Sequence, residues 1–313
     1  MGADDNRGMS THSSTNTAFD GVVALADWGV IRAEGSDAAS FLHAQLTQDI
    51  AALDAGSASL AGYCSPKGRL LASFVVARPS PDTVWLACSA DLLPAVHKRL
   101  SMFVLRSKCR LTDATGELQV RGAAGSAAPP GLAPWQANGP WLGLPPAEGV
   151  GRALWIGPAA EAPDAPAWTP DAWAWLEVMS AVPRIQAATA EQFVPQMVNL
   201  ELVGGVNFRK GCYPGQEVVA RSQYRGTTKR RLSLWESPVS MHAGQEVFHS
   251  DDPGQPAGMV VLAASHAGRH AAQLELKLAA AERGQLHLGA ADGPVLSRLP
   301  MPYALPTDAD LAA

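Results

Sequence analysis

The sequence predicts an α+β protein: two units that mix helices with antiparallel strands, followed by a C-terminal antiparallel β-barrel. A chain of 313 residues is too long for one ordinary hydrophobic core, so two or three domains are expected. Strand-like and helical patterns are interleaved up to about residue 112, whereas after Lys229 only short β runs remain, separated by glycine and proline turns. The expected divisions are 1–17, 18–121, 122–228 and 229–313.

The first unit is predicted to have the order strand, helix, strand, strand, strand, helix, strand. Residues 19–33 alternate as a strand pair broken near Ala26-Asp27. Ser36 is the expected N-cap of a helix over 37–48, and Ser89 that of a second helix. The remaining strands are expected over 57–64, 69–78, 83–88 and 103–112, the first two joined by the turn Ser65-Pro-Lys-Gly68.

The second and third units have fewer sequence patterns that predict helices or strands. Residues 122–151 are rich in alanine, proline and glycine and are expected to form loops. A strand over 152–157 then precedes a helix with Thr169 as N-cap and Pro170 in the first turn, and Thr189-x-x-Gln192 predicts another helix start. The barrel strands are expected over 229–236, 245–249, 257–264, 271–278 and 285–288.

Composition is typical of a globular protein, with 47% hydrophobic and 17% charged residues. The first 17 residues are polar and are expected to be a disordered lead rather than a signal peptide. The longest uncharged span, 122–147, contains six prolines and five glycines, so no membrane segment is predicted. The cysteines are far apart and outside any metal-ligand spacing, which predicts free thiols in a reducing compartment and no metal site. They are Cys64, Cys88, Cys109 and Cys212.

Several common enzyme classes are excluded by missing motifs. The chain has no G-x-G-x-x-G after a strand, no G-x-x-x-x-G-K-[ST], no H-E-x-x-H and no G-x-S-x-G. Nucleotide-dependent dehydrogenases, P-loop NTPases, zinc hydrolases of the common type and α/β-hydrolases are therefore not expected.

The octapeptide Lys-Gly-Cys-Tyr-Pro-Gly-Gln-Glu at 210–217 is the most informative motif. Its glycines and proline predict a tight turn that carries Cys212 just ahead of a helix over 215–223. The helix dipole, backbone N–H groups and Lys210 would favour thiolate over thiol, which makes a cysteine reactive. The alternative is a small apolar residue that fills a turn.

Basic residues cluster around the same motif. Residues 209–231 carry seven of them against one acid, Glu217, in a chain whose net charge is −5. Such a patch would suit a phosphate backbone, a polyglutamyl tail or an acidic protein surface, although Arg221 and Arg225 alone would also fit a solvated helix face. The seven are Arg209, Lys210, Arg221, Arg225, Lys229, Arg230 and Arg231.

Tryptophan is abundant, with nine residues in the chain. Trp28 lies in the first strand pair, and Trp173 and Trp175 lie two apart in the helix that begins at Pro170. These rings could hold a flat heteroaromatic ligand, although core packing is the usual role of tryptophan.

The segment from Phe193 to Arg221, which contains the octapeptide, resembles the signature of the YgfZ family. That family comprises folate-binding proteins of iron–sulfur cluster maturation, related in fold to the aminomethyltransferase (T-protein) of the glycine cleavage system. Asp27-Trp28, Phe41-Leu-His-Ala-Gln-Leu-Thr-Gln-Asp49 and Cys64-Ser-Pro-Lys-Gly-Arg69 resemble other motifs of the family. The resemblance implies three domains in a ring around a folate-binding channel, the last a β-barrel.

By position, the resemblance assigns folate contacts to Trp28 and Trp173, with Trp175 as the fallback, and the functional thiol to Cys212, next to Lys210. Arg221 of the basic patch is the candidate for contact with the folate tail. Two departures from the aminomethyltransferase stand out: Ala72 and Ser73 occupy the place of its catalytic aspartate, and Met179 that of its pterin-binding glutamate. A transfer that needs those carboxylates could not use these residues.

The leading hypothesis is therefore a cytoplasmic factor that binds tetrahydrofolate or a derivative and supports assembly or repair of iron–sulfur clusters, including those of tRNA-thiolating enzymes. Its partners would be folate and iron–sulfur client or assembly proteins, and it would not be a turnover enzyme. The alternatives are a folate-dependent aminomethyl or one-carbon transferase, which rests on fold similarity alone, and a module that contacts tRNA directly through the basic patch.

Overall fold

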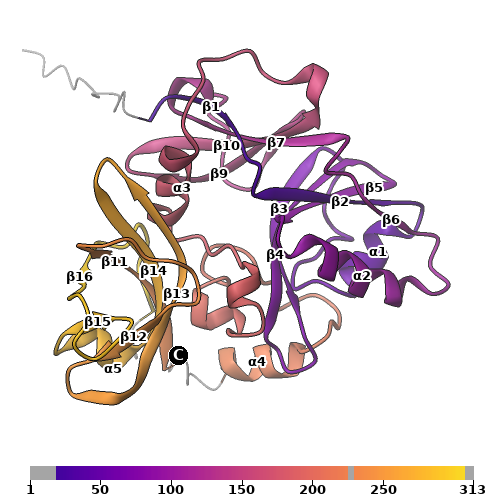
Figure 1. The fold of residues 1–313 in the computed structure, drawn as a ribbon. Helices are drawn as coiled ribbons and strands as arrows, with labels where there is room; N and C mark the ends of the chain where they lie inside the picture. Colours follow the sequence, from indigo (N-terminus) through magenta and orange to yellow (C-terminus); the bar gives the residue numbers. More distant parts are fainter. Residues whose placement is uncertain (1–18, 225–228, 307–313) are drawn as a thin grey trace, which may run out of the picture.

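Three antiparallel sheets surround a central region that is filled by the irregular segment after residue 180, as the computed structural model shows (Figure 1). The structure describes residues 19–224 and 229–306. Within these ranges no helix is long and apolar enough to cross a membrane. The α+β class, with a C-terminal barrel, is confirmed.

The first sheet has the strand order β3-β4-β5-β2-β6 and carries helices α1 and α2. The order of elements along the chain is the one predicted for this unit. The bounds are β2 (Trp28–Glu34), α1 (Ala38–His43), β3 (Ser57–Cys64), β4 (Leu70–Ser80), β5 (Thr83–Ser89), α2 (Leu93–Val104) and β6 (Arg110–Asp113).

Both serine caps predicted in this unit are wrong. The residue before α1 is Asp37, whose carboxylate accepts from Lys108 N at 2.7 Å instead of capping the helix. Ser89 accepts from Arg184 Nη1 at 3.0 Å, and α2 begins four residues later. α1 ends early because the Thr47 hydroxyl is buried and bonded to Gly62 N and Gly205 O. The strand expected from 103 starts at Arg110, because Phe103 and Val104 still belong to α2.

The second sheet has the order β1-β7-β10-β9-β8. It overturns the expectation of loops over 122–151. The expected division at 121/122 falls inside β7, and β1 pairs with β7 rather than with β2. The bounds are β1 (Gly21–Ala24), β7 (Leu118–Ala124), β8 (Ala137–Asn138), β9 (Trp141–Ala147) and β10 (Val150–Pro158).

Helix α3 (Pro170–Met179) joins the second sheet to the third. As predicted, Thr169 caps it, accepting from Ala172 N at 3.3 Å. The small residues of β7 have a packing role: a Cβ on Gly122 would lie 2.7 Å from Cζ3 of Trp173. The indole therefore lies directly against the strand, and a larger residue at 122 would displace it.

Short helical turns fill the space between the three sheets, and α4 lies at the edge of the molecule with only Val219 buried (Figure 1). The helix predicted at Thr189 is absent, because the Thr189 hydroxyl accepts from Gln186 N at 3.1 Å and closes a single 3₁₀ turn over Ala187–Thr189. Another 3₁₀ turn spans Pro195–Val198. Helix α4 (Gln216–Tyr224) begins at the end of the octapeptide, just after Cys212 as predicted, with Glu217 in its first turn.

The third sheet has the order β15-β12-β13-β14-β11-β16 and curls into the predicted barrel. Leu288 N donates to Pro294 O and Leu296 N to Leu286 O, each at 2.9 Å, which joins β15 to the segment that leads into β16. The bounds are β11 (Arg230–Ser237), β12 (Glu246–His249), β13 (Asp252–His266), β14 (Arg269–Lys277), α5 (Leu278–Glu282), β15 (Leu286–Leu288) and β16 (Ser297–Arg298).

Candidate functional site

A small buried space, here called the inner cavity, lies where α3 approaches the first two sheets. Trp28 and Ser73 reach it from the first sheet, Arg152 from the second, and Glu177 and Arg184 from α3 and the segment after it. The rest of its lining is largely apolar, with Leu60, Phe74, Val75, Leu144 and Val182 among the residues. Polar side chains in such surroundings interact strongly because water does not screen them.

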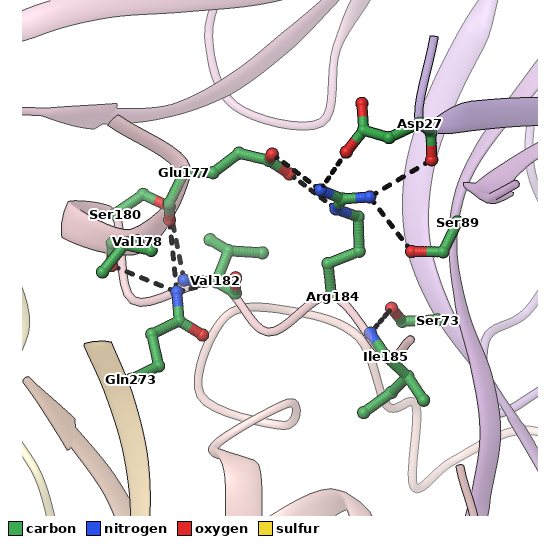
Figure 2. A network of polar contacts seen from close by, with 10 residues as sticks. All are labelled: Asp27, Ser73, Ser89, Glu177, Val178, Ser180, Val182, Arg184, Ile185 and Gln273. Atoms are coloured by element: carbon green, nitrogen blue, oxygen red, sulfur yellow. Dashed lines mark hydrogen bonds and ion pairs between the residues drawn. The ribbon is translucent and has the colours of Figure 1, made fainter. Parts of the chain in front are cut away.

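The end of α3 is fixed by the barrel, which sets the position of the polar groups in the cavity. The buried Gln273 amide of β14 donates to the carbonyls of Glu177, Val178 and Val182 at 3.1–3.2 Å. Ala181 then adopts φ of +52° and ends the helix, and its carbonyl accepts from the Tyr303 hydroxyl at 2.8 Å. The chain turns back so that Arg184 faces Glu177 (Figure 2).

Arg184 forms the centre of a buried polar network (Figure 2). Its Nε and Nη2 bind the two Glu177 oxygens at 3.0 and 3.1 Å, and Nη2 also binds Asp27 Oδ2 at 2.6 Å. Its guanidinium lies 5.0 Å from the Trp28 ring centre, a cation–π distance. Burial raises the pKa of Glu177, an effect that Arg184 partly offsets. The network holds the Trp28 ring, the end of α3 and the first sheet together.

Arg152 is the second cation of the cavity lining, and no carboxylate of the described residues forms an ion pair with it. Its side chain is 4% exposed, its Nε donates to Pro145 O at 3.0 Å, and it lies 5.4 Å from the Trp173 ring centre. Its Nη1 is buried without a hydrogen-bond partner among the described residues, as is Trp28 Nε1. Burial lowers the pKa of Arg152 to about 10, so it is charged at neutral pH. The cavity therefore contains unmet donors.

The inner cavity is next to a much larger open space. The enclosed volume is about 30 Å³, enough for a water molecule or two. An outer pocket of about 590 Å³ shares Trp135, Pro145 and Ser180 with it and reaches Tyr303. Trp135 has φ of +61° and donates from Nε1 to Val203 O at 2.8 Å. A ligand of drug-like size would fit the outer pocket and could extend only one edge into the inner cavity.

The structure places the three predicted tryptophans differently. Trp28 lines the inner cavity. Trp173 is fully buried between Gly122 and Arg152 and does not itself line the cavity. Trp175 faces the barrel, where Arg269 lies 4.9 Å from its ring centre. Side chains two residues apart on a helix point in different directions, which explains why Trp173 and Trp175 lie in different surroundings.

A carboxylate that sequence reasoning missed lies in the cavity. Met179 packs half-buried against the core, but Glu177, one half-turn earlier, lines the cavity. Ser73 lines it too, with its hydroxyl accepting from Ile185 N at 3.0 Å, whereas Ala72 is buried in the core. The cavity thus has an acid, although both Glu177 oxygens already bind Arg184. The only sequence signal was a glutamate in the apolar stretch that follows Asp171 in this helix, seven residues before an arginine.

Cys212 is an exposed free thiol on a loop, residues 210–215, that will be called the Cys212 loop. The loop packs on the turn at residues 65–68: a Cβ on Gly215 would lie 2.7 Å from Gly68 Cα. Gly215 has φ of +79°, which favours glycine. Gln216 Nε2 donates to Gly211 O at 3.3 Å across the loop. The predicted tight turn ahead of a helix is therefore present.

Lys210 anchors this loop and does not present its charge to solvent. Its ammonium donates to the carbonyls of His43 and Leu46, the latter at 2.7 Å, and lies 5.0 Å from the Tyr213 ring centre. Burial lowers the pKa of Lys210 to about 8, partly offset by Asp49 and Cys212. His43, in turn, binds Asp49 through Nδ1 at 2.9 Å. Residues 41–49, 64–69 and 210–217 thus meet at one place.

The predicted basic patch is largely dispersed. Arg230 pairs with Glu275, Arg231 is buried against Glu201, and Arg221 on α4 pairs with Glu217 at 3.1 Å. Arg209 and Lys229 are exposed, and Arg225 lies outside the described residues. Neither Arg221 nor any residue of the Cys212 loop lines the inner cavity or the outer pocket. The two candidate sites are therefore separate.

Metal binding has no support in residues 19–224 and 229–306, where no three His, Cys, Asp or Glu side chains form a group that could hold an ion. The buried thiols are unsuited to such a role because burial raises the pKa of both Cys64 and Cys88 to about 12.

The fold is also that of a solved enzyme. The glycine cleavage system aminomethyltransferase T from Bartonella henselae superposes with a TM-score of 0.71 at 14% identity, over 91% of this chain and 87% of that one. At this identity the likeness shows the fold alone.

Curated relatives share more sequence. No family model matches the chain. Three relatives bear the name tRNA-modifying protein YgfZ. The protein from Sodalis glossinidius is 28% identical over 91% of this chain and 93% of its own length. That from Serratia proteamaculans is 30% identical over 67% and 69%, and that from Klebsiella pneumoniae 31% identical over 67% and 70%. This chain therefore belongs to the YgfZ family.

Proposed function

We propose that this protein is a cytoplasmic factor that binds tetrahydrofolate or a derivative and supports assembly or repair of iron–sulfur clusters, including those of tRNA-thiolating enzymes. The observation that carries the proposal is the inner cavity, where the Trp28 ring and buried, unpartnered donors face one space. The aminomethyltransferase-like fold and the relatives' name, tRNA-modifying protein, support it.

The residues of the cavity fit a pterin in chemistry and only partly in size. A pterin offers a flat face for Trp28 and oxygen and nitrogen acceptors for unmet donors. The inner cavity is too small for the whole ring, so the ligand body would lie in the outer pocket, whose volume is in the usual range for small-molecule sites. Trp135, at the boundary between the two spaces, would contact it.

Cys212 is proposed to act on a partner rather than on the folate. It is exposed, and its loop lines neither of the two spaces. Lys210 and Gly215 fix the loop against the first sheet, so the thiol is held at a defined position on the surface. A held, exposed thiol suits contact with a client's cluster or with an assembly protein.

Folate binding is tested by titrating tetrahydrofolate anaerobically and following tryptophan fluorescence. Saturable quenching is expected. Trp28→Phe keeps an aromatic face but replaces the indole by a smaller ring without the N–H donor, and should weaken binding about three- to tenfold. Trp175→Phe is the matched control, because Trp175 faces the barrel, and should bind like the wild type. Absence of saturable binding at millimolar ligand would remove the folate proposal.

The thiol is tested in cells that lack the native protein, by measuring the activity of iron–sulfur enzymes and the thiolation of tRNA. Cys212→Ala should reduce rescue to the level of an empty vector. Cys109→Ala is the matched control, since Cys109 is half-buried and outside the octapeptide, and should rescue fully. Full rescue by Cys212→Ala would refute a role for this thiol.

A folate-dependent aminomethyl or one-carbon transferase is the second candidate, and one observation favours it: the carboxylate of Glu177 lies in the cavity. Against it, Arg184 already binds both oxygens of Glu177. Methylene transfer from an aminomethyl donor by the purified protein, lost in Glu177→Gln, would establish this activity. A purified protein that binds tetrahydrofolate without any transfer would exclude it.

A further inference from the structure

We propose that Arg152 selects the ligand of the inner cavity by donating a hydrogen bond from Nη1 to an uncharged oxygen acceptor, which on a folate is the 4-oxo group of the pterin ring. This inference rests on the proposed folate binding and adds the residue that would recognise the edge of the pterin ring, Arg152. It follows from the bonding, the charge and the surroundings of one side chain.

Arg152 has unused hydrogen-bonding capacity in a place where that is costly. Nε donates to Pro145 O at 3.0 Å, whereas Nη1 is buried without a partner among the described residues. Native proteins leave few buried donors unmet, because each loses its bonds to water and gains none in return. A donor that lines a cavity and lacks a partner is a position where a ligand can supply the acceptor.

The charges around the cavity favour a neutral acceptor over a carboxylate. Two cations, Arg152 and Arg184, are offset by two anions: Glu177, which lines the cavity, and Asp27, which binds Arg184 from outside the cavity lining with a side chain that is 58% exposed. Burying the carboxylate of a glutamyl tail there would add an uncompensated charge to apolar surroundings. A ring carbonyl satisfies Nη1 without that cost.

Other buried donors of the cavity lining have the same character. Trp28 Nε1 and Arg184 Nε also lack a hydrogen-bond partner among the described residues, whereas Glu177 Oε2 accepts from Arg184 Nη2 and Oε1 lies 3.0 Å from Arg184 Nε in an ion pair. These buried groups without a hydrogen-bond partner are donors, so the edge of the ligand that enters the cavity should present acceptors. A 4-amino pterin would place a donor next to these donors, so the cavity should bind it more weakly than a 4-oxo pterin.

The test measures the affinity of three reduced ligands by equilibrium dialysis: tetrahydrofolate, tetrahydroaminopterin, which has 4-amino in place of 4-oxo, and tetrahydropteroate, which lacks the glutamate. The wild type should prefer tetrahydrofolate to tetrahydroaminopterin about a hundredfold or more. Arg152→Met should weaken tetrahydrofolate and tetrahydropteroate equally, by about tenfold or more, and reduce the preference to about tenfold or less.

Two further variants control for folding and charge. Arg121→Met removes a half-buried arginine of β7, outside the cavity, and should behave like the wild type. Arg152→Lys keeps the charge but not the planar fork and should give an intermediate preference. An unchanged preference in Arg152→Met and Arg152→Lys overturns the proposal, as does a loss confined to tetrahydrofolate, which would place the glutamyl tail at Arg152. If the wild type binds none of the three ligands, the proposal of folate binding is refuted, and the proposal for Arg152 falls with it.

Discussion

Replacing Arg184 by methionine is expected to lower the free energy of unfolding by about 3–5 kcal/mol at pH 8. The substitution leaves the buried Glu177 carboxylate without the cation that binds both its oxygens. It also frees Ser89 Oγ and removes the cation over the Trp28 ring. An uncompensated buried charge is among the most destabilising single changes known in proteins.

The loss should depend on pH with a defined sign. Burial already raises the pKa of Glu177 in the wild type, and removing Arg184 takes away the interaction that offsets this effect. Because the folded-state pKa lies above the unfolded value, the folded variant is penalised as pH rises through it and recovers as pH falls toward the unfolded value of about 4.3. Urea unfolding of variant and wild type at pH 5.5 and pH 8 should therefore show the larger difference at pH 8.

A second substitution separates the charge from the lost packing. Adding Glu177→Gln to Arg184→Met replaces the carboxylate by a neutral amide of the same shape, and should recover a large part of the stability at pH 8 and flatten its pH dependence. If the double variant is no more stable than Arg184→Met, or if the single variant loses the same amount at both pH values, the buried charge is not the cause.

The sequence predicted the elements whose signals are local. Thr169 and Pro170 start α3 as expected, because a cap needs only the residues beside it. The barrel strands were found from their turns and their alternation. The second sheet was missed because its alanines and glycines have no strand pattern of their own. Gly122 is small because Trp173, 51 residues later, packs on it.

The cap predicted at Ser89 failed because a distant contact overrides a local signal. Ser89 fits a local capping pattern, but a buried arginine 95 residues away needs its hydroxyl more. Long-range satisfaction of a buried guanidinium is worth more than one cap, so the tertiary contact decides.

In the candidate sites, too, features set by neighbouring residues could be predicted, and features set by residues distant in the sequence could not. The turn at Cys212 could be predicted because its glycines and proline act locally. The partners of Lys210 could not, since they are two backbone carbonyls, of His43 at the end of α1 and of Leu46 just after it. The pairing of Glu177 with Arg184 depends on how α3 ends at Ala181 and Gln273, which no spacing rule contains.

Gly215→Ala is expected to have the second largest effect, a loss of about 2–4 kcal/mol in the free energy of unfolding, together with failure to support iron–sulfur enzymes. Two costs combine at this residue. Its φ of +79° costs an alanine about 1–2 kcal/mol, and the new Cβ would lie 2.7 Å from Gly68 Cα and Gly68 N. Backbone atoms cannot rotate away, so the Cys212 loop has to move off the turn at residues 65–68.

Two other glycines separate these costs. Gly56 has φ of +81° with no atom within 4 Å of its Cβ position, so Gly56→Ala should show the backbone strain alone, about 1–2 kcal/mol. Gly116 has neither feature, and Gly116→Ala should change stability by less than about 0.5 kcal/mol. Both controls should rescue iron–sulfur enzymes fully. If Gly215→Ala folds with only the loss seen for Gly56→Ala and also rescues fully, then the thiol does not need its fixed position, and the motif glycine serves the fold alone.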